Sequence, residues 1–412
     1  MRHLIIGGSI ASVGAIEGIR SIDPEGQITV VTNESNPYYS RPLISYYLAG
    51  KIGADQLYYR PPNFYKANNV EVLINKVETI DTTRRIAILA DGQELEWNRL
   101  LIATGGKPLL FDVFAQGREN VVGFYTLDDE KKVRDFVQAG TRVVIIGAGL
   151  VGLKAAEALH FTGADITVVD AVPGVLPATL DEEASFLVQH HLERKGIKFK
   201  LGYKVASVNG IPLANSVLVE NGDSLPCDLV IVAAGTAANL AIIKETSVKT
   251  DKGILVDEHL QTSIECIYAA GDVVEALDES SGQRKVLPLL PVAYEQGRTA
   301  GINMAGGESY YRGSVALNST SLLGLPIMSA GDSKSDGIKI NWGDPESPRY
   351  RKVVLQDGVP VGFVAVNNAE KMGIITELIR KRIDVGGREA RLLDPDFTGI
   401  DFIDLIESGQ GR

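Results

Sequence analysis

A glycine-rich turn between a short apolar run and a helix-like run occurs twice in this chain, and this repetition constrains the fold most. The first copy starts at Gly7 in HLIIGGSIASVGAIEGIR (3–20), and the second starts at Gly147 in VVIIGAGLVGLKAAEAL (143–159). Each copy is followed by another apolar run that ends in an acid, QITVVTNE in the first and DITVVD in the second. The pattern predicts two βαβ units, each with a nucleotide site at its turn.

The second turn has the full spacing of a dinucleotide-binding turn, with Gly147, Gly149 and Gly152 directly after the strand. The first glycine permits the tight turn, the second lets the backbone approach a pyrophosphate, and the third lets the helix pack on the strand. Asp170 stands where a carboxylate accepts hydrogen bonds from a ribose 2′-hydroxyl. That carboxylate repels a 2′-phosphate, and residues 171–176 contain no Arg or Lys. We therefore expect NADH here; the alternative is a glycine turn that binds nothing.

The first turn keeps its first glycine but has Ser9 and Ser12 at the next two positions. Serine adds only a hydroxymethyl group, which is tolerable where the backbone needs no positive φ, and its hydroxyl can donate to a phosphate. Gly14 and Gly18 would compensate for the helix packing that Ser12 hinders. Glu34 occupies the position of the ribose acid. The motif alone is ambiguous, but its place as the earlier of two repeats favours a nucleotide site.

Short β-branched runs separated by helix-like runs predict an α/β protein with two doubly wound Rossmann-like domains. Two stretches differ, because RRIAILADGQELEW (84–97) and YRKVVLQDGVPVGFVAVN (350–367) each place Asp-Gly between two strand-like runs, as in a β-hairpin. The second is followed by the helix-like AEKMGIITELIRKRI (369–383), which predicts a smaller mixed α/β domain at the C-terminus. We expect a first nucleotide-binding domain in two parts, 1–110 and 237–308, a second at 111–236, and a C-terminal interface domain at 309–412.

Composition narrows the function. The 412 residues carry a net charge of -11 and the pI is near 5.1, which argues against a nucleic-acid binder because phosphate backbones attract basic surfaces.

Cys227 and Cys266 lie far apart in the sequence, so we expect no disulfide. His190 and His191 fall in a solvated helix pattern without ligating neighbours, so we expect no metal site. No apolar run approaches the ~20 residues of a membrane span. The first strand begins at about His3, which leaves no room for a signal peptide, so we expect a cytoplasmic protein.

Four motifs, in order, carry a family resemblance. They are the turn at Gly7, LLIATGG (100–106), the turn at Gly147, and CIYAAGDVVE (266–275). Over residues 1 to about 308 the chain resembles the flavoproteins with two dinucleotide-binding domains, the pyridine nucleotide-disulfide oxidoreductase superfamily. The resemblance implies that the first turn binds FAD and the second binds NAD(H).

The resemblance also implies which residues contact the cofactors. Asp272, which follows Gly271, would hydrogen-bond the ribityl chain of the flavin, and LPLLPVAYEQGRTAG (287–301) would close over the flavin ring. Gly235 would lie near the nicotinamide. The other residues implied to line FAD are Arg41, Pro42, Val77, Ala103, Thr104 and Gly105.

Many members of the superfamily carry a redox-active cysteine shortly after the first ribose acid, and this chain has none there. Its stretch PYYSRPLISYYLAG (37–50) is most similar to the NADH-oxidising modules of nitrite reductase and rubredoxin reductase, and to the FAD subunit (epsilon) of phenylglyoxylate dehydrogenase, an iron-sulfur 2-oxoacid oxidoreductase. The resemblance implies an FAD-dependent NADH:acceptor oxidoreductase that passes electrons to an iron-sulfur protein or another subunit of a complex. The alternatives are a free-standing rubredoxin or ferredoxin reductase or an NADH oxidase, and a structural or redox-sensing flavoprotein subunit.

Two features concern charge. Where many relatives pair a Glu with a Lys beside the flavin, this chain has Lys154 and Tyr46. Lys154 is the candidate catalytic residue, because a lysine there would raise the reduction potential of the flavin; the alternative is a solvated helix residue.

A dense basic stretch, IRKRIDVGGREAR (379–391), could dock an acidic partner, although such a run is more often a solvated helix end. In relatives the domain at 309–412 forms the dimer or partner surface, which implies a homodimer or a complex.

Overall fold

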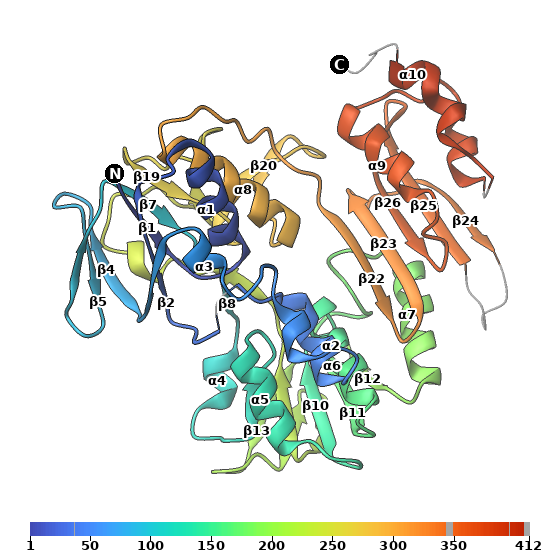
Figure 1. Ribbon diagram of the computed structural model, residues 1–412. Helices are drawn as coiled ribbons and strands as arrows, with labels where there is room; N and C mark the ends of the chain where they lie inside the picture. Colours follow the sequence, from blue (N-terminus) through green and yellow to red (C-terminus); the bar gives the residue numbers. More distant parts are fainter. Residues whose placement is uncertain (37, 343–348, 395, 408–412) are drawn as a thin grey trace.

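The first turn belongs to a five-stranded parallel sheet. The computed structural model, which describes residues 1–36, 38–342, 349–394 and 396–407, has these strands in the order β19-β7-β1-β2-β3 (Figure 1). The central strand is buried from His3 to its end, as expected for a parallel sheet covered on both faces. The strands are β1 (Arg2–Ile6), β2 (Gln27–Thr32), β3 (Val70–Ile74), β7 (Arg99–Ile102) and β19 (Ile267–Ala269).

The second turn belongs to a second parallel sheet with the matching strand arrangement, in the order β12-β11-β10-β16-β9. Its strands are β9 (Val121–Gly123), β10 (Arg142–Ile146), β11 (Asp165–Asp170), β12 (Lys198–Leu201) and β16 (Leu229–Val232). The two sheets confirm the predicted α/β fold. Their strands fall within 1–110 or 237–308 for the first sheet and within 111–236 for the second, while the domain boundaries themselves stay a prediction.

An antiparallel three-stranded meander accompanies each parallel sheet, so the repeat extends beyond the turns. In the first meander the predicted hairpin turns at Asp91 and Gly92, where Gly92 has a φ of 87°. In the second the corresponding turn holds Gly222, with a φ of 90°. The strands are β4 (Val77–Asp81), β5 (Ile86–Leu89) and β6 (Glu94–Glu96), and then β13 (Val205–Asn209), β14 (Ser216–Val219) and β15 (Ser224–Pro226).

Two helices far apart in sequence, α1 (Ile10–Ile22) and α8 (Leu290–Met304), lie side by side (Figure 1). A Cβ atom on Gly14 would lie 2.3 Å from the carbonyl oxygen of Tyr294, and one on Gly301 would lie 2.2 Å from that of Ala15. Gly14 therefore permits close packing as predicted, but its partner is α8. The contact holds residues 1–110 and 237–308 together and sets both helix N-termini at one end.

Short elements connect the two nucleotide-binding sheets. Strands β8 (Gly106–Pro108) and β17 (Thr236–Ala238) follow β7 and β16 in the chain and pair antiparallel. The other helices in this part are α2 (Ile44–Leu48), α3 (Phe64–Ala67), α4 (Phe111–Ala115), α5 (Leu127–Phe136), α6 (Leu150–His160) and α7 (Glu182–Arg194), and the other strands are β18 (Ile254–Leu255), β20 (Val274–Asp278) and β21 (Gln283–Lys285). No helix in the described ranges is long and apolar enough to cross a membrane.

The C-terminal part is an antiparallel sheet in the order β22-β23-β26-β25-β24, covered by helix α9 (Met372–Lys381). The predicted hairpin and helix are both present, and Asp357 and Gly358 form the turn with φ values of 50° and 80°. Ile375 and Leu378 of α9 pack in one core with Phe363 of β26. The elements are β22 (Leu317–Leu322), β23 (Leu325–Gly331), β24 (Ile338–Trp342), β25 (Arg349–Gln356), β26 (Val359–Val366) and a short α10 (Ile403–Glu407).

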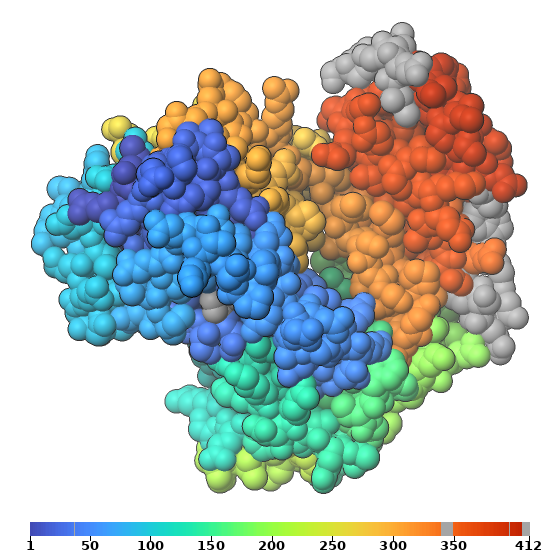
Figure 2. Space-filling model, in the orientation of Figure 1, coloured from blue at the N-terminus to red at the C-terminus, as the bar shows by residue number. Residues whose placement is uncertain are grey.

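This C-terminal sheet rests on helices α6 and α7 of the second nucleotide-binding part (Figure 2). At the tip of the β22–β23 hairpin, the amide of Leu323 donates to Glu157 at 3.1 Å, and His191 Nε2 lies 3.1 Å from the carbonyl oxygen of Leu323. The expectation of a solvated His191 is therefore wrong, because the tip of the hairpin covers that side of α7. Further along, Asp181 accepts from Lys352 at 2.6 Å and from the Tyr350 hydroxyl at 2.7 Å.

Breaking the Asp181 contact tests this junction. The side chains of Lys352 and Asp181 are 4% and 17% exposed. Burial alone would raise the pKa of Asp181, but hydrogen bonds from Lys352, Tyr350 and the amide of Ala184 outweigh it and hold the pKa below its usual range. The stabilisation is therefore complete above about pH 4 and is lost as the pH falls through the lowered pKa.

We expect Asp181→Asn to lower the free energy of unfolding at pH 7 by about 3–5 kcal/mol, because Lys352 would be left buried without its counter-charge. Urea unfolding measures the change. Asp228→Asn, which breaks the surface pair with Arg142, is the control and should cost less than about 1 kcal/mol, since both side chains are nearly half exposed. Equal losses for the two variants would contradict the assignment.

Candidate functional site

Gly7 makes the first turn tight enough to close on the next strand. Its φ is 122°, and a Cβ atom there would lie 2.1 Å from the carbonyl oxygen of Ala103. Only glycine satisfies both conditions. The turn therefore contacts the start of the Ala103-Thr104-Gly105 segment, which the family resemblance implies lines FAD.

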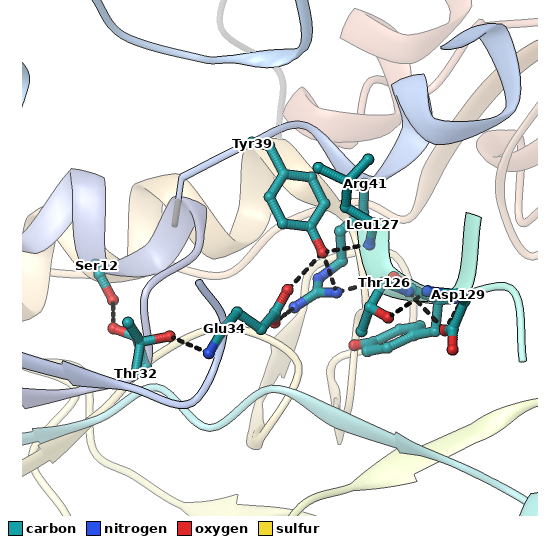
Figure 3. Close-up of polar contacts among 10 residues, drawn as sticks. Ser12, Thr32, Glu34, Tyr39, Arg41, Thr126, Leu127 and Asp129 are labelled. Atoms are coloured by element: carbon teal, nitrogen blue, oxygen red, sulfur yellow. Dashed lines mark hydrogen bonds and ion pairs between the residues drawn. The ribbon is translucent and has the colours of Figure 1, made fainter. Parts of the chain in front are cut away.

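Ser9 and Ser12, which replace the second and third glycines, play different parts. The Ser12 hydroxyl donates to the carbonyl of Gly7, and its side chain is 1% exposed (Figure 3). It is therefore used inside the turn and does not reach a phosphate. Ser9 is the N-cap of α1 and makes no capping bond with its side chain. Its hydroxyl is thus the one that can donate to a ligand at the helix N-terminus.

Gly147 and Gly152 have the tight-turn and packing roles predicted for them, and the pyrophosphate role of Gly149 stays a prediction. Gly147 has a φ of 119°, and a Cβ atom there would lie 2.2 Å from the carbonyl oxygen of Ala233. A Cβ atom on Gly152 would lie 2.0 Å from the carbonyl oxygen of Gly147, so this glycine lets α6 close on the turn. Gly149, the N-cap of α6, has open space above it. The space is where a pyrophosphate would approach the helix N-terminus.

Asp170, at the carboxyl end of β11, fastens the second turn. Its two carboxylate oxygens accept from the amides of Ala148 and Val172, at 2.7 and 2.9 Å. Sequence reasoning missed the apolar surface beside it: Val172 and Tyr203, whose amide donates to the Asp170 carbonyl, are 45% and 42% exposed. Tyr203 follows β12, the strand that pairs with β11. The strand order could therefore have indicated that Tyr203 lies at the same edge of the sheet as Asp170. Exposed apolar side chains beside a ribose acid suit an adenine ring.

Gly271 and Asp272 lie between the N-termini of α1 and α8. The amide of Gly271 donates to Gln296 of α8 at 2.9 Å, and a Cβ atom on Gly271 would meet Ala11 and Ala293. Burial raises the pKa of the Asp272 carboxyl, against the opposing effect of Arg41. A partly buried carboxylate needs donors, and the hydroxyl groups of a ribityl chain would supply them. This observation fits FAD at the first turn.

The other predicted site residues, those for FAD and Gly235 for the nicotinamide, are spread over the crossover between the two sheets and the first nucleotide-binding part. Thr104 donates to the carbonyl of Asn239 at 2.8 Å and so fixes the crossover. Gly235 accepts from the amide of Leu109, beside β8. Val77 is 5% exposed in the first core, and Pro42 lies in the short 3-10 helix Arg41–Leu43. Their contacts with a cofactor stay a prediction.

A small pocket opens at the carboxyl ends of β1 and β2, beside the first turn. Glu34 lies in it and accepts from Tyr39 at 2.5 Å and from Arg41 (Figure 3). The lining residues are Gly8, Ser9, Thr32, Glu34, Asn36, Tyr38, Tyr39 and Arg41. The helix N-terminus, the acid and the pocket fit the adenosine half of FAD.

Lys154 is neither solvated nor free. Its ammonium group lies 4.4 Å from the centroid of the Tyr46 ring, so the two positions predicted to pair do face each other. Sequence reasoning missed Glu157, one turn along α6, which forms an ion pair with Lys154. The opposite charge reduces the field that this lysine can exert on a nearby group. An effect of Lys154 on the reduction potential of the flavin stays a prediction.

The two cysteines are buried and separate. Burial raises the pKa of the Cys227 thiol to about 11, and Arg99 donates to the sulfur of Cys266. A buried thiol with a raised pKa is a poor nucleophile. Cys227 therefore offers no thiol route for electrons, and Cys266 is a free cysteine that is only 3% exposed.

The glycines of the second turn yield a matched pair of variants. Gly152→Ala should lower the free energy of unfolding by about 1–3 kcal/mol, because its Cβ atom meets a backbone oxygen. Gly149→Ala should change it by less than about 0.5 kcal/mol, since its φ is -76° and its space is open. The same variant should raise the Kd for NADH about 10-fold or more by crowding the pyrophosphate. Thermal melts and NADH titrations measure both; unchanged NADH binding in Gly149→Ala would contradict the placement.

Comparison with known proteins agrees with this geometry. The model of the pyridine nucleotide-disulphide oxidoreductase family matches residues 1–297. The epsilon subunit of NADH-dependent phenylglyoxylate dehydrogenase from Aromatoleum evansii is 31% identical over 95% of this chain and 94% of its own. An assimilatory nitrate reductase electron transfer subunit from Bacillus subtilis is 27% identical over 97% of this chain, but the match spans only 52% of that protein.

A solved structure shows the same fold over the whole chain. The covalent complex of putidaredoxin reductase with putidaredoxin superposes with a TM-score of 0.89 at 27% identity, covering 100% of this chain and 99% of that one. The family, the fold and the predicted enzyme class are thereby confirmed. The chain belongs to the pyridine nucleotide-disulphide oxidoreductase family, and its cofactors are FAD and NAD(H), as the family resemblance implied.

Proposed function

We propose that this protein is an FAD-dependent NADH:acceptor oxidoreductase that passes electrons between NAD(H) and an iron-sulfur protein or a partner subunit. The observation that carries the proposal is the pair of nucleotide turns, each at the carboxyl edge of its own parallel sheet, joined by the β8–β17 pair. The full-length match to an NADH-dependent dehydrogenase subunit supports it. The work of the chain is to hold two nucleotides in fixed relation.

When bound, FAD accepts two electrons from NADH and releases them one or two at a time. The residues of this chain bind and orient. The N-termini of α1 and α6 would direct amides at the two pyrophosphates, and Asp272, next to Gly271 at the N-terminus of α8, would accept from ribityl hydroxyl groups. Thr104 and Asn239 fix the crossover that sets one nucleotide site against the other.

NADH is the proposed reductant because of Asp170. Its carboxylate is held in place by the amides of Ala148 and Val172, at the end of β11, where it would accept from a ribose 2′-hydroxyl. A 2′-phosphate would meet this negative charge without a cation, since residues 171–176 include no Arg or Lys. We therefore propose a strong preference against NADPH.

The electrons leave to another protein because the two cysteines, buried and separate, form no internal disulfide route. This supports an iron-sulfur partner, as do the putidaredoxin complex and the dehydrogenase subunit among the similar proteins. The stretch 379–391 is a weaker candidate for docking than its sequence indicates, because three of its five basic residues form ion pairs. The pairs are Lys381 with Glu377, Arg388 with Asp404, and Arg391 with Asp394 and Asp401.

A second candidate is a free-standing rubredoxin reductase or an NADH oxidase. Its support is the identity of 27–31% to proteins so named from Clostridium acetobutylicum and Methanocaldococcus jannaschii. A structural or redox-sensing flavoprotein subunit is the third. We also propose a cytoplasmic location, in keeping with two free, buried cysteines; a homodimer stays a prediction.

Anaerobic mixing tests the function. We expect yellow protein whose flavin absorbance bleaches within a second on addition of NADH, and at least about 100-fold more slowly with NADPH because of Asp170. Stopped-flow absorbance measures both rates. Oxygen, rubredoxin and ferredoxin, added in turn to the reduced protein, then rank the acceptors. Protein that stays oxidised with NADH would favour the structural subunit, and rapid reoxidation by oxygen alone would favour the oxidase.

Charge reversal tests the docking role of the basic stretch. Arg380 and Arg382 are exposed at the end of α9. If they steer an acidic acceptor, Arg380→Glu with Arg382→Glu should lower the second-order rate of acceptor reduction about 10-fold at low salt, and the difference should vanish at high salt. Arg388→Glu, at a position already paired with Asp404, is the control. An unchanged rate and salt dependence would remove this stretch from the partner surface.

A further inference from the structure

Tyr39 joins the acid at the first nucleotide turn to the second nucleotide-binding part. Its phenol is 3% exposed and donates to Glu34 at 2.5 Å. The same oxygen accepts from the amide of Leu127, in the first turn of α5, at 3.1 Å. Figure 3 shows Tyr39 between Glu34 on one side and Leu127 on the other.

Arg41 makes the second half of this connection. Its guanidinium donates to Glu34, to the Tyr39 hydroxyl at 3.1 Å, and to the carbonyl of Tyr125 at 2.8 Å. It also lies over the Tyr125 ring, 4.5 Å from the centroid. Two hydrogen bonds, from the Leu127 amide to Tyr39 and from Arg41 to the Tyr125 carbonyl, and the contact of Arg41 with the Tyr125 ring thus link residues 34–41 to the segment that leads into α5.

Protonation fixes the direction of every hydrogen bond. Burial raises the pKa of the Tyr39 phenol far above its ordinary range, so the group keeps its proton and donates it to Glu34. Burial would lower the pKa of Arg41, but Tyr39 and Glu34 outweigh burial and keep the guanidinium charged. The chain of donors therefore runs from Leu127 and Arg41 through Tyr39 to Glu34, and such chains strengthen their members.

The carboxylate of Glu34 keeps room for a ligand. An ionised carboxylate has about four acceptor sites, and Tyr39 and Arg41 occupy two of them. The other two are available to ribose hydroxyls in the pocket beside Gly8 and Ser9. The side chain is thus oriented before a nucleotide arrives.

We propose that Tyr39 is a positioning residue that orients Glu34 for the adenosine ribose of FAD and, through Leu127, couples FAD binding to the start of α5. The inference rests on the proposed binding of FAD at the first turn. Because coupling is reciprocal, filling the pocket should stabilise the first turn of α5, and loosening that turn should weaken FAD binding.

Tyr39→Phe tests the proposal, since it removes one oxygen and keeps the ring. We expect the Kd for FAD to rise about 10-fold. In the unaltered protein, saturating FAD should slow hydrogen exchange of the amides of residues 127–131 about 10-fold; in Tyr39→Phe, with the site filled, the slowing should fall below about 2-fold. A purely structural role would change the stability without changing this FAD-dependent protection.

Tyr65→Phe is the matched control. The Tyr65 hydroxyl is buried and has no hydrogen-bond partner among the described residues, so its loss should leave the Kd for FAD and the exchange pattern unchanged. If Tyr39→Phe fails to fold, Arg41→Lys decides, because it keeps the charge but cannot bridge Glu34 and the Tyr125 carbonyl, and it should show the same two effects. Unaltered FAD affinity and protection in the folded variant would overturn the proposal. Failure of the unaltered protein to bind FAD would instead overturn the proposed function.

Discussion

The structure depends on one backbone contact that occurs twice. In each parallel sheet the glycine after the central strand lies against the carbonyl of an alanine at the end of a neighbouring strand, Gly7 against Ala103 and Gly147 against Ala233. No side chain fits between them. The contact bends the chain at once into a helix whose N-terminus stays at the carboxyl edge of the sheet, and both nucleotide sites follow from that placement.

The first nucleotide site also depends on a second contact. The chain leaves the first sheet after β7 and rejoins it only at β19, which α8 follows. The returning helix lies directly on α1, backbone against backbone. Their N-termini therefore converge on Gly271 and Asp272, which come from the returning segment as well. A site for one cofactor is thus assembled from residues more than 250 positions apart, as in the pairing of Ala11 with Gly271.

The fold and the backbone conformation of both glycine turns could be predicted from the sequence, because each depends on residues that are close together in the chain. A glycine with positive φ, an acid at the end of a strand and Asp-Gly between two strand-like runs can each be recognised within about 20 residues. The contacts of His191 with Leu323 and of Tyr39 with Leu127 could not be predicted in this way, because each joins segments more than 80 residues apart. The pair of Lys154 with Glu157 lies within one turn of α6, so local spacing could have indicated it.

The hydrogen bonds of α6 and α7 to the tip of the β22–β23 hairpin have a mechanical consequence. Glu157, Lys154 and His191 all hold backbone groups of residues 321–323, and Asp181 holds Lys352 further along the same sheet. Helix α6, which begins at the NAD(H)-binding turn, is thereby fixed to the C-terminal sheet. Any movement of α6 on binding or release of NAD(H) moves the sheet with it. A partner protein bound to the sheet would therefore be displaced when the reductant is exchanged.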